Sequence, residues 1–117
     1  MTPFFEGRVG PGWAQMGART SSVDYTNLPN ELGAPHLEIF KRFYADTATF
    51  GSSAAIECAL QFYGVDHVVF ASDAPFDPER GPMYIRETIK VLDELEISDA
   101  DRQKIYYENL AGLIGLK

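Results

Sequence analysis

The chain has 117 residues, of which 45% are hydrophobic, and it carries a net charge of −7. This length allows one domain or part of one. The acidic charge excludes nucleic acid as an expected partner, because phosphate binding needs a basic surface. The single cysteine, Cys58, excludes an internal disulfide framework, and no segment approaches the roughly 20 apolar residues of a membrane span. We therefore expect a cytoplasmic protein that contacts neither nucleic acid nor a membrane.

Residues 1–42 are predicted to be a loop-rich lead-in. Pro11 or Gly12 can open a short helix over Trp13–Arg19, and residues 36–42 can form two helical turns. The first 35 residues are punctuated by glycine and proline at Gly7, Gly10, Pro11, Gly12, Gly17, Pro29, Gly33 and Pro35. Such irregular chain is unusual at the start of a compact domain. We expect either a functional loop region or a segment that packs on something else.

Residues 43–117 begin with a predicted strand and helix. The segment Phe43–Ala48 is rich in strand formers and stops at a glycine and two serines. Ser52 or Ser53 can cap the helix that follows. That helix is predicted over residues 53–63, and Gly64 fits the left-handed residue that often ends a helix.

A second strand is predicted at Val68–Ala71, where a short apolar run is bounded by turn signals. The loop 72–81 is rich in proline and glycine. Apolar residues then recur on one helical face over 83–95. Ser98 can cap a final helix, which Gly115 can end. The predicted order of elements is therefore β-α-β-α-α.

Alternating strands and helices predict parallel strands in an α/β fold. A parallel sheet is normally covered by helices on both faces and needs several strands. Since only two strands are predicted, we expect this chain to be part of a larger α/β domain.

Asp73 is the main candidate site residue. It follows the second predicted strand, and α/β barrels and doubly wound sheets place their chemistry at the carboxyl ends of strands. An aspartate before a proline-rich loop can also just close a turn through its side chain. Both interpretations of Asp73 stay open at this point. Cys58 falls in an apolar helical pattern and is predicted to be a core residue.

Three segments resemble the end of the amidohydrolase-related barrels. They are Phe43–Ala48, Gly64–Phe76 with its Ser-Asp-x-Pro-Phe element, and Tyr107–Leu116 with its Asn-Leu-Ala-x-x-Leu element. The closest subgroup is the aminocarboxymuconate-semialdehyde decarboxylase type. The resemblance implies a TIM (β/α)8 barrel with a mononuclear metal site, of which this chain would be the last two β/α units and their lead-in. Asp73 matches the carboxylate that binds the metal or lies against its water.

The opening segment Pro3–Arg8 resembles the stretch that follows the acid–base histidine in this subgroup. In some decarboxylases the matching arginine helps to bind the substrate carboxylate across a subunit contact. The resemblance therefore implies a substrate-binding role for Arg8 and a homo-oligomer. Arg8 can equally be a solvated or structural arginine in a glycine-rich loop.

The metal-binding and acid–base histidines that the resemblance implies would precede Met1, because His36 and His67 match neither set. In a complete enzyme, the resemblance implies a divalent metal, with zinc as the best fit and manganese also suitable. The substrate would be a small carboxylic or aromatic acid, and the reaction decarboxylation or hydrolysis. Asp73 alone supplies too few ligands for zinc, so this chain is expected to retain no metal and to be inactive by itself.

Two other interpretations remain. The chain can be a non-catalytic interaction or dimerisation module derived from this fold, because uncovered apolar surface normally marks an interface. An acidic phospho-acceptor domain fits less well, because it needs a lysine on a later strand. Among other acids, Asp46 can support the site or close a turn, and Asp77 and Glu79 are predicted to be solvated loop residues.

Overall fold

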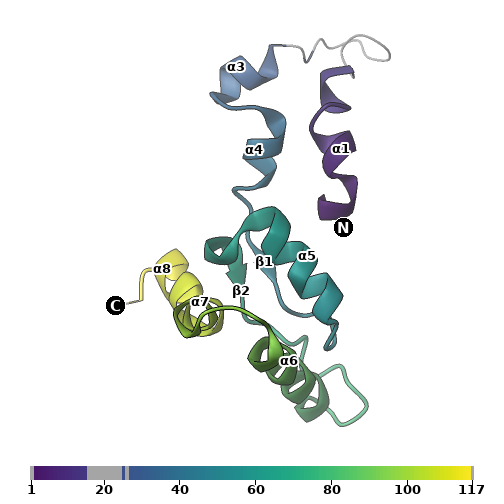
Figure 1. Ribbon diagram of the computed structural model, residues 1–117, viewed down its shortest axis with the longest axis vertical. Helices are drawn as coiled ribbons and strands as arrows, with labels where there is room; N and C mark the ends of the chain where they lie inside the picture. Colours follow the sequence, from purple (N-terminus) through teal and green to yellow (C-terminus); the bar gives the residue numbers. More distant parts are fainter. Residues whose placement is uncertain (1, 16–24, 26, 117) are drawn as a thin grey trace. The chain divides into compact units, whose positions relative to one another are not determined.

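The computed structural model describes residues 2–15, 25 and 27–116 (Figure 1). The chain divides into two compact units, Met1–Phe43 and Tyr44–Lys117. Among the described residues, no helix is long and apolar enough to cross a membrane.

The first unit contains short helical elements in its described part. They are the 3-10 helix η1 (Thr2–Phe5), α1 (Glu6–Val9), the 3-10 helix η2 (Trp13–Gln15), α3 (Leu28–Leu32) and α4 (His36–Phe40). The helix predicted over Trp13–Arg19 is seen as η2, and its residues 16–19 lie outside the described part. The helix predicted over 36–42 is confirmed by α4.

An aromatic contact joins η2 to α4 within the first unit. The ring of Trp13 lies 5.2 Å from that of His36 and 6.1 Å from that of Phe40, measured between centroids. His36 is buried beneath it. Gly12 permits this turn, because a Cβ atom there would lie 2.4 Å from the carbonyl oxygen of Arg8. The buried His36 is therefore a packing residue of this unit.

The second unit is built on two parallel strands, as the sequence predicts. Strand β1 (Ala45–Asp46) pairs with β2 (Val68–Val69), with Ala45 opposite Val68. Helix α5 (Ser53–Tyr63) connects them. The Ser52 hydroxyl caps α5 by accepting a hydrogen bond from the amide of Ala55.

Both strands are shorter than the sequence predicts. The chain leaves the ladder after Thr47, whose amide donates to the carbonyl of Val69 at 3.1 Å. The carbonyl of Thr47 then accepts from the amide of Thr49 at 2.7 Å, which turns the chain away. A local turn thus replaces the next backbone pairing of β1.

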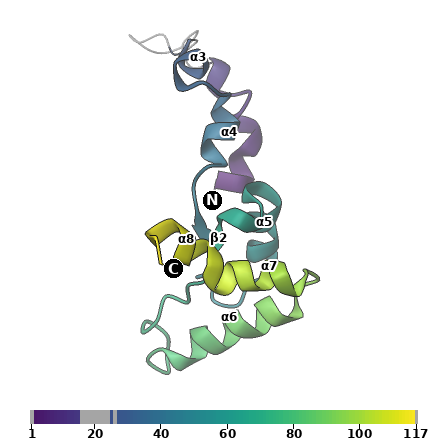
Figure 2. The same cartoon turned by 90° about the vertical axis from the view of Figure 1, so that its left-hand side faces the viewer.

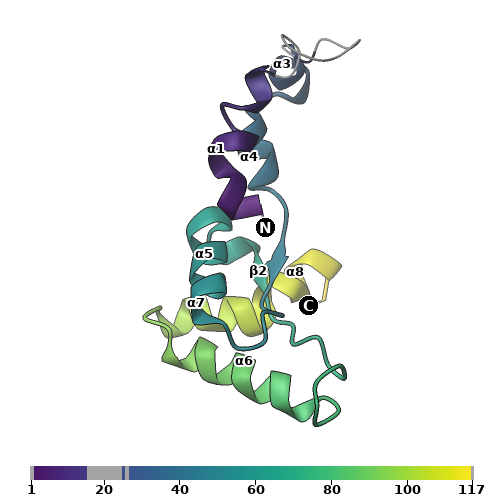
Figure 3. The ribbon, with the colours of Figure 1, turned by 90° about the vertical axis from the view of Figure 1, so that its right-hand side faces the viewer.

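Four further helical elements follow β2 in the described part of the second unit. Helix α6 (Pro82–Glu94) is followed by α7 (Asp99–Gln103), the π-helical turn η4 (Lys104–Glu108) and α8 (Asn109–Ile114). Figures 2 and 3 show α6 and α7 lying beside each other. The predicted ends are confirmed, because the Ser98 hydroxyl caps α7 and Gly115 ends α8 in the left-handed conformation.

The core of the second unit gathers one side chain from each of four elements. Ile56 of α5, Val68 of β2, Leu92 of α6 and Ile105 of η4 are at most 1% exposed and form one cluster. Fully burying such a side chain contributes about 1.5–3 kcal/mol. Helices that are separate in the sequence are therefore held together through β2.

The π-helical turn η4 fastens the C-terminal helices to β2. The Asn109 amide donates to the carbonyl of Lys104, five residues earlier, which leaves the Ile105 carbonyl free of the helical ladder. That carbonyl accepts from the amide of Phe70 at 2.9 Å. The side-chain amide of Asn109 donates to the carbonyls of Val65 and Val68 at 2.7 and 2.8 Å. The edge of β2 that faces away from β1 is thus covered.

Replacing Asn109 by alanine should destabilise the second unit by about 1–3 kcal/mol, because two carbonyls lose their donor. Thermal or urea unfolding measures this loss. Gln103→Ala is the matched control, since Gln103 is exposed on the same helical segment, and its effect should stay within about 0.5 kcal/mol. Equal melting of the two variants would contradict the role given to Asn109.

Candidate functional site at the end of strand β2

Asp73 lies four residues beyond the last residue of β2, at the carboxyl end of the strand, and its side chain is exposed. Its φ of +62° is uncommon for a residue other than glycine. Aspartate and asparagine tolerate this region better than most side chains do. Backbone in such a conformation persists only where the surroundings impose it.

The turn at Asp73 is closed by the backbone. The carbonyl of Asp73 accepts from the amide of Phe76 at 3.2 Å, and the Ala74–Pro75 peptide bond between them is cis. Within the described residues, no hydrogen bond is made by the Asp73 carboxylate. The carboxylate is therefore available for chemistry at the strand end.

Asp46, at the end of β1, behaves differently. Its carboxylate accepts from the amide of Ala48, two residues further on, at 2.9 Å. This is the local side-chain bond of an aspartate that closes a turn. The two strand-end aspartates thus differ in whether the carboxylate is already used.

Asp77 is not the solvated loop residue that the sequence predicts. It is 6% exposed, and its carboxylate accepts from the amides of Glu79 and Tyr84 at 2.7 and 3.1 Å. Gly81 precedes α6 and has no side chain to cap it, so Asp77 supplies the acceptor from four residues upstream. The lack of a capping side chain just before Pro82 was the sequence signal that could have revealed this role of Asp77. Asp77 ties the loop after Asp73 to the start of α6.

The surroundings of Asp77 also change its acidity. Burial acts to raise the pKa of the Asp77 carboxyl, but hydrogen bonds from the amides of Tyr84, Gly81 and Glu79 outweigh it. The pKa is therefore held below its usual 3.8, because these donors stabilise the charged form. Glu79 itself is exposed and pairs with Arg86 at 3.1 Å.

The other residues considered from the sequence include Arg8 and His67. Arg8 is exposed in α1, with its guanidinium carbon 6.0 Å from the centroid of the Phe5 ring. Arg8 belongs to the first unit and Asp73 to the second. His67 lies in the 3-10 helix η3 (Val65–His67) at the amino end of β2, with its ring 4.9 Å from that of Tyr44. It is therefore at the opposite end of the strand from Asp73.

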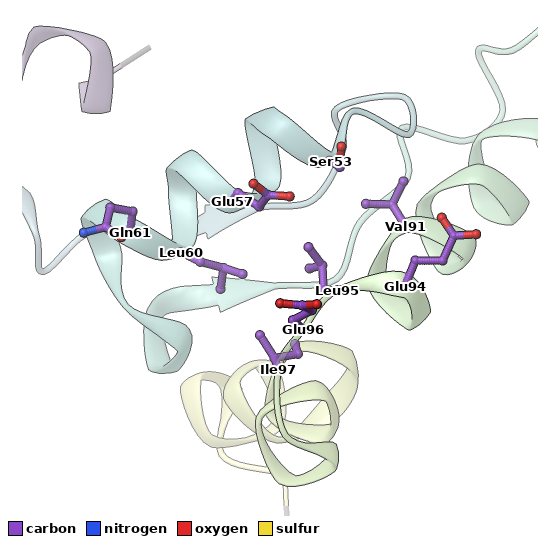
Figure 4. A pocket seen from close by; sticks show the side chains of 9 residues that line it. All are labelled: Ser53, Glu57, Leu60, Gln61, Val91, Glu94, Leu95, Glu96 and Ile97. Atoms are coloured by element: carbon purple, nitrogen blue, oxygen red, sulfur yellow. The ribbon is translucent and has the colours of Figure 1, made fainter.

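A groove in the second unit lies elsewhere. It has a volume of about 580 Å³ and runs between α5 and the end of α6 (Figure 4). Its lining combines three glutamates with polar and aliphatic groups: Ser53, Glu57, Leu60, Gln61, Val91, Glu94, Leu95, Glu96 and Ile97. No residue between 71 and 81 lines it. The groove is thus separate from the candidate site at the strand end.

The described residues do not by themselves fit a metal centre. Among them, no group of three or more His, Cys, Asp or Glu side chains is placed to hold a metal ion. Zinc sites in proteins use three or four such ligands. Asp73 could supply one ligand, so a metal centre there would need further ligands from outside this set.

Comparison with known proteins places these features in a family. The model of the amidohydrolase family matches residues 11–116, and the chain therefore belongs to the amidohydrolase family. This confirms the family inferred from the Ser-Asp-x-Pro-Phe and Asn-Leu-Ala-x-x-Leu elements. Amidohydrolases are generally metal-dependent. No curated protein matches the chain.

Two solved structures are similar to this chain in fold. One is a 2,6-dihydroxybenzoate decarboxylase complexed with 2,6-dihydroxybenzoate, with 20% identity and a TM-score of 0.64. The other is a 2,6-dihydroxybenzoate decarboxylase from Rhizobium, with 19% identity and a TM-score of 0.65. Each match covers 97% of this chain and 31% of the other. The chain thus spans about a third of each decarboxylase, and its paired parallel strands are consistent with part of a TIM barrel.

The lowered pKa of Asp77 predicts a specific acid response. The stabilisation from its ionised form is fully present above the unfolded pKa near 3.8 and is lost as the pH falls through the lower folded value. Asp77→Asn should therefore lower the melting temperature at about pH 6, and the difference from the unchanged protein should narrow towards about pH 3. Calorimetry over this range measures it.

Glu57→Gln serves as the control for Asp77→Asn, because it removes one charge at an exposed position of α5. The interpretation of Asp77 is wrong if the two variants follow the same stability profile with pH.

Proposed function

We propose that residues 1–117 form the C-terminal segment of a metal-dependent amidohydrolase-type barrel, with 1–42 as lead-in and 43–117 as the last two β/α units. The complete protein would be a decarboxylase or hydrolase of a small carboxylic or aromatic acid. The observation that carries this proposal is Asp73, whose carboxylate is exposed and unused at the carboxyl end of a parallel strand. The family match and the fold shared with the decarboxylases support it.

Asp73 is the proposed catalytic and metal-site residue of the complete enzyme. A carboxylate at this position can accept a proton from a reacting group or serve as one oxygen ligand of a divalent ion. Zinc or manganese is the proposed ion. Because the described residues do not fit a metal centre alone, the remaining ligands would come from the rest of the barrel.

Arg8 is the proposed substrate-binding residue. A guanidinium can bind a carboxylate through two parallel hydrogen bonds, which suits recognition of an acidic substrate. Its exposed position in α1 leaves the guanidinium accessible. A cytoplasmic location and assembly into a homo-oligomer belong to the same proposal.

Asp73→Asn tests the proposed role in a complete barrel that contains this segment. The change keeps the size of the side chain and removes its charge, so turnover should fall by at least roughly 10²–10⁴-fold while the fold is retained. Asp46→Asn is the control, because asparagine can make the same turn as Asp46. Near-normal turnover of Asp73→Asn with unchanged metal content would remove Asp73 from the active site.

The chain by itself should show no decarboxylase or hydrolase activity and should not retain stoichiometric zinc after desalting. The reason is that a zinc centre needs three or four ligands, and Asp73 is the one that we propose from this chain. Metal analysis by mass spectrometry and an assay with 2,6-dihydroxybenzoate measure both. One tightly held zinc ion per chain would show this expectation to be wrong.

A second candidate function is a non-catalytic dimerisation module. Apolar side chains of the C-terminal helix are more than 40% exposed and include Tyr107, Leu110, Leu113 and Ile114. Tyr107, Leu110 and Ile114 recur at helical spacing, so they share one face. Because the outer edge of β2 is covered by η4, this apolar face is what favours self-association with a second copy.

Light scattering over a range of concentrations tests the dimerisation module. The chain should self-associate, and the double variant Leu110→Gln/Ile114→Gln should shift it towards monomer. Ile85→Gln/Ile89→Gln is the control, because these two isoleucines are each 38% exposed on α6. A monomer at every concentration would exclude this function.

A further inference from the structure

The pairing between β1 and β2 continues beyond the backbone ladder. Residues two apart on a strand direct their backbone groups to the same side, so Ala71 faces β1 as Val69 does. The backbone of β1 cannot continue to pair there, because the Thr47 carbonyl already accepts from the amide of Thr49. Both backbone groups of Ala71 therefore need another partner.

The hydroxyl of Thr47 takes that place. Its Oγ1 donates to the carbonyl of Ala71 at 2.8 Å and accepts from the amide of Ala71 at 3.0 Å. A hydroxyl has one donor and two acceptor positions, so one group can satisfy both needs. The side chain of Thr47 is fully buried. The strand is thus fixed two residues further than its backbone pairing reaches.

Asp73 follows Ala71 by two residues, and its own carboxylate does not hold it. Two local hydrogen bonds span it, from the amide of Ala74 to the Ser72 hydroxyl at 3.4 Å and from the amide of Phe76 to the Asp73 carbonyl at 3.2 Å. The loop that carries this left-handed residue is itself anchored on both sides. On the near side Thr47 fixes Ala71, and on the far side Asp77 ties the loop to α6. Between these two anchors the chain makes the turn that presents the Asp73 carboxylate.

We infer that Thr47 is a positioning residue for Asp73, acting through its two hydrogen bonds to Ala71. This inference rests on the proposed function of Asp73. The positioning role requires the hydroxyl of residue 47, and the shape of the side chain matters less. Serine should therefore replace threonine, whereas valine, which has the same shape without the hydroxyl, should fail.

The first measurement uses the 117-residue chain and needs no activity. Amide hydrogen exchange at Ala71, taken relative to Ile56 in the core, should become at least about 10-fold faster in Thr47→Val and stay within about 3-fold in Thr47→Ser. The amide and Cβ resonances of Asp73 should shift in Thr47→Val and return in Thr47→Ser. Equal acceleration at Ala71 and Ile56 would show a role in stability alone and would overturn the inference.

Thr88→Val is the matched control for Thr47→Val. Thr88 is also fully buried, but its hydroxyl has no hydrogen-bond partner among the described residues. Removing that hydroxyl should leave the relative exchange of Ala71 and the resonances of Asp73 unchanged. If Thr88→Val reproduces the changes seen in Thr47→Val, the effect is not specific to Thr47 and the inference fails.

The second measurement uses a complete barrel that contains this segment. Thr47→Val should lower kcat at least about 10-fold with a smaller change in KM, because the misplaced group acts on the reacting atoms, and Thr47→Ser should restore kcat. If Asp73→Asn is inactive while Thr47→Val keeps its kcat, the inference about Thr47 is overturned and the proposed function stands. If Asp73→Asn turns over normally, the proposed function fails. Thr47 then has no role in catalysis, whatever the exchange data show.

Discussion

The hydrogen bonds that hold β2 from both of its edges are the constraint on which the second unit depends. On the β1 side, Val69 is paired by the backbone and Ala71 by the hydroxyl of Thr47. On the opposite side, Val68 and Phe70 are paired by the C-terminal helical segment, through the Asn109 amide and the Ile105 carbonyl. A two-stranded sheet is marginal alone, so side-chain and helix groups supply the partners that further strands would provide.

This arrangement explains why a helix of the second unit contains a π-helical turn. A regular α-helix would use the carbonyl of Ile105 for the amide of Asn109. The wider turn sends that amide to Lys104 and releases the carbonyl of Ile105 to Phe70. Turns of this kind are rare and often mark functional sites. Here the turn places Ile105 in the core and the side chain of Asn109 on the strand.

The candidate site is a short exposed turn between two well-anchored points. Asp73 combines an unusual backbone conformation with a carboxylate that makes no hydrogen bond within the described part of the chain. Thr47 and Asp77 are buried, and their side chains hold the chain around it through hydrogen bonds. In sites built on rigid elements, some residues typically hold the backbone in place while others stay available to bind or react. The same distinction separates Asp73 from Asp46, which occupies a comparable place on β1 but closes its own turn.

The sequence by itself determined the family, the order of elements in residues 43–117 and the position of Asp73 after β2. These features depend on local signals, such as the cap at Ser52 and the breakers after Ala71, which act over a few residues. The sequence did not reveal the burial of Asp77, because its partner Tyr84 lies across a loop whose path was unknown. Only the tertiary structure brought Thr47 to Ala71, 24 residues away, and Asn109 to Val68, 41 residues away. Contacts at such separations are decided by how the helices close the chain around β2, since no local pattern specifies which distant carbonyl a buried hydroxyl or amide will meet.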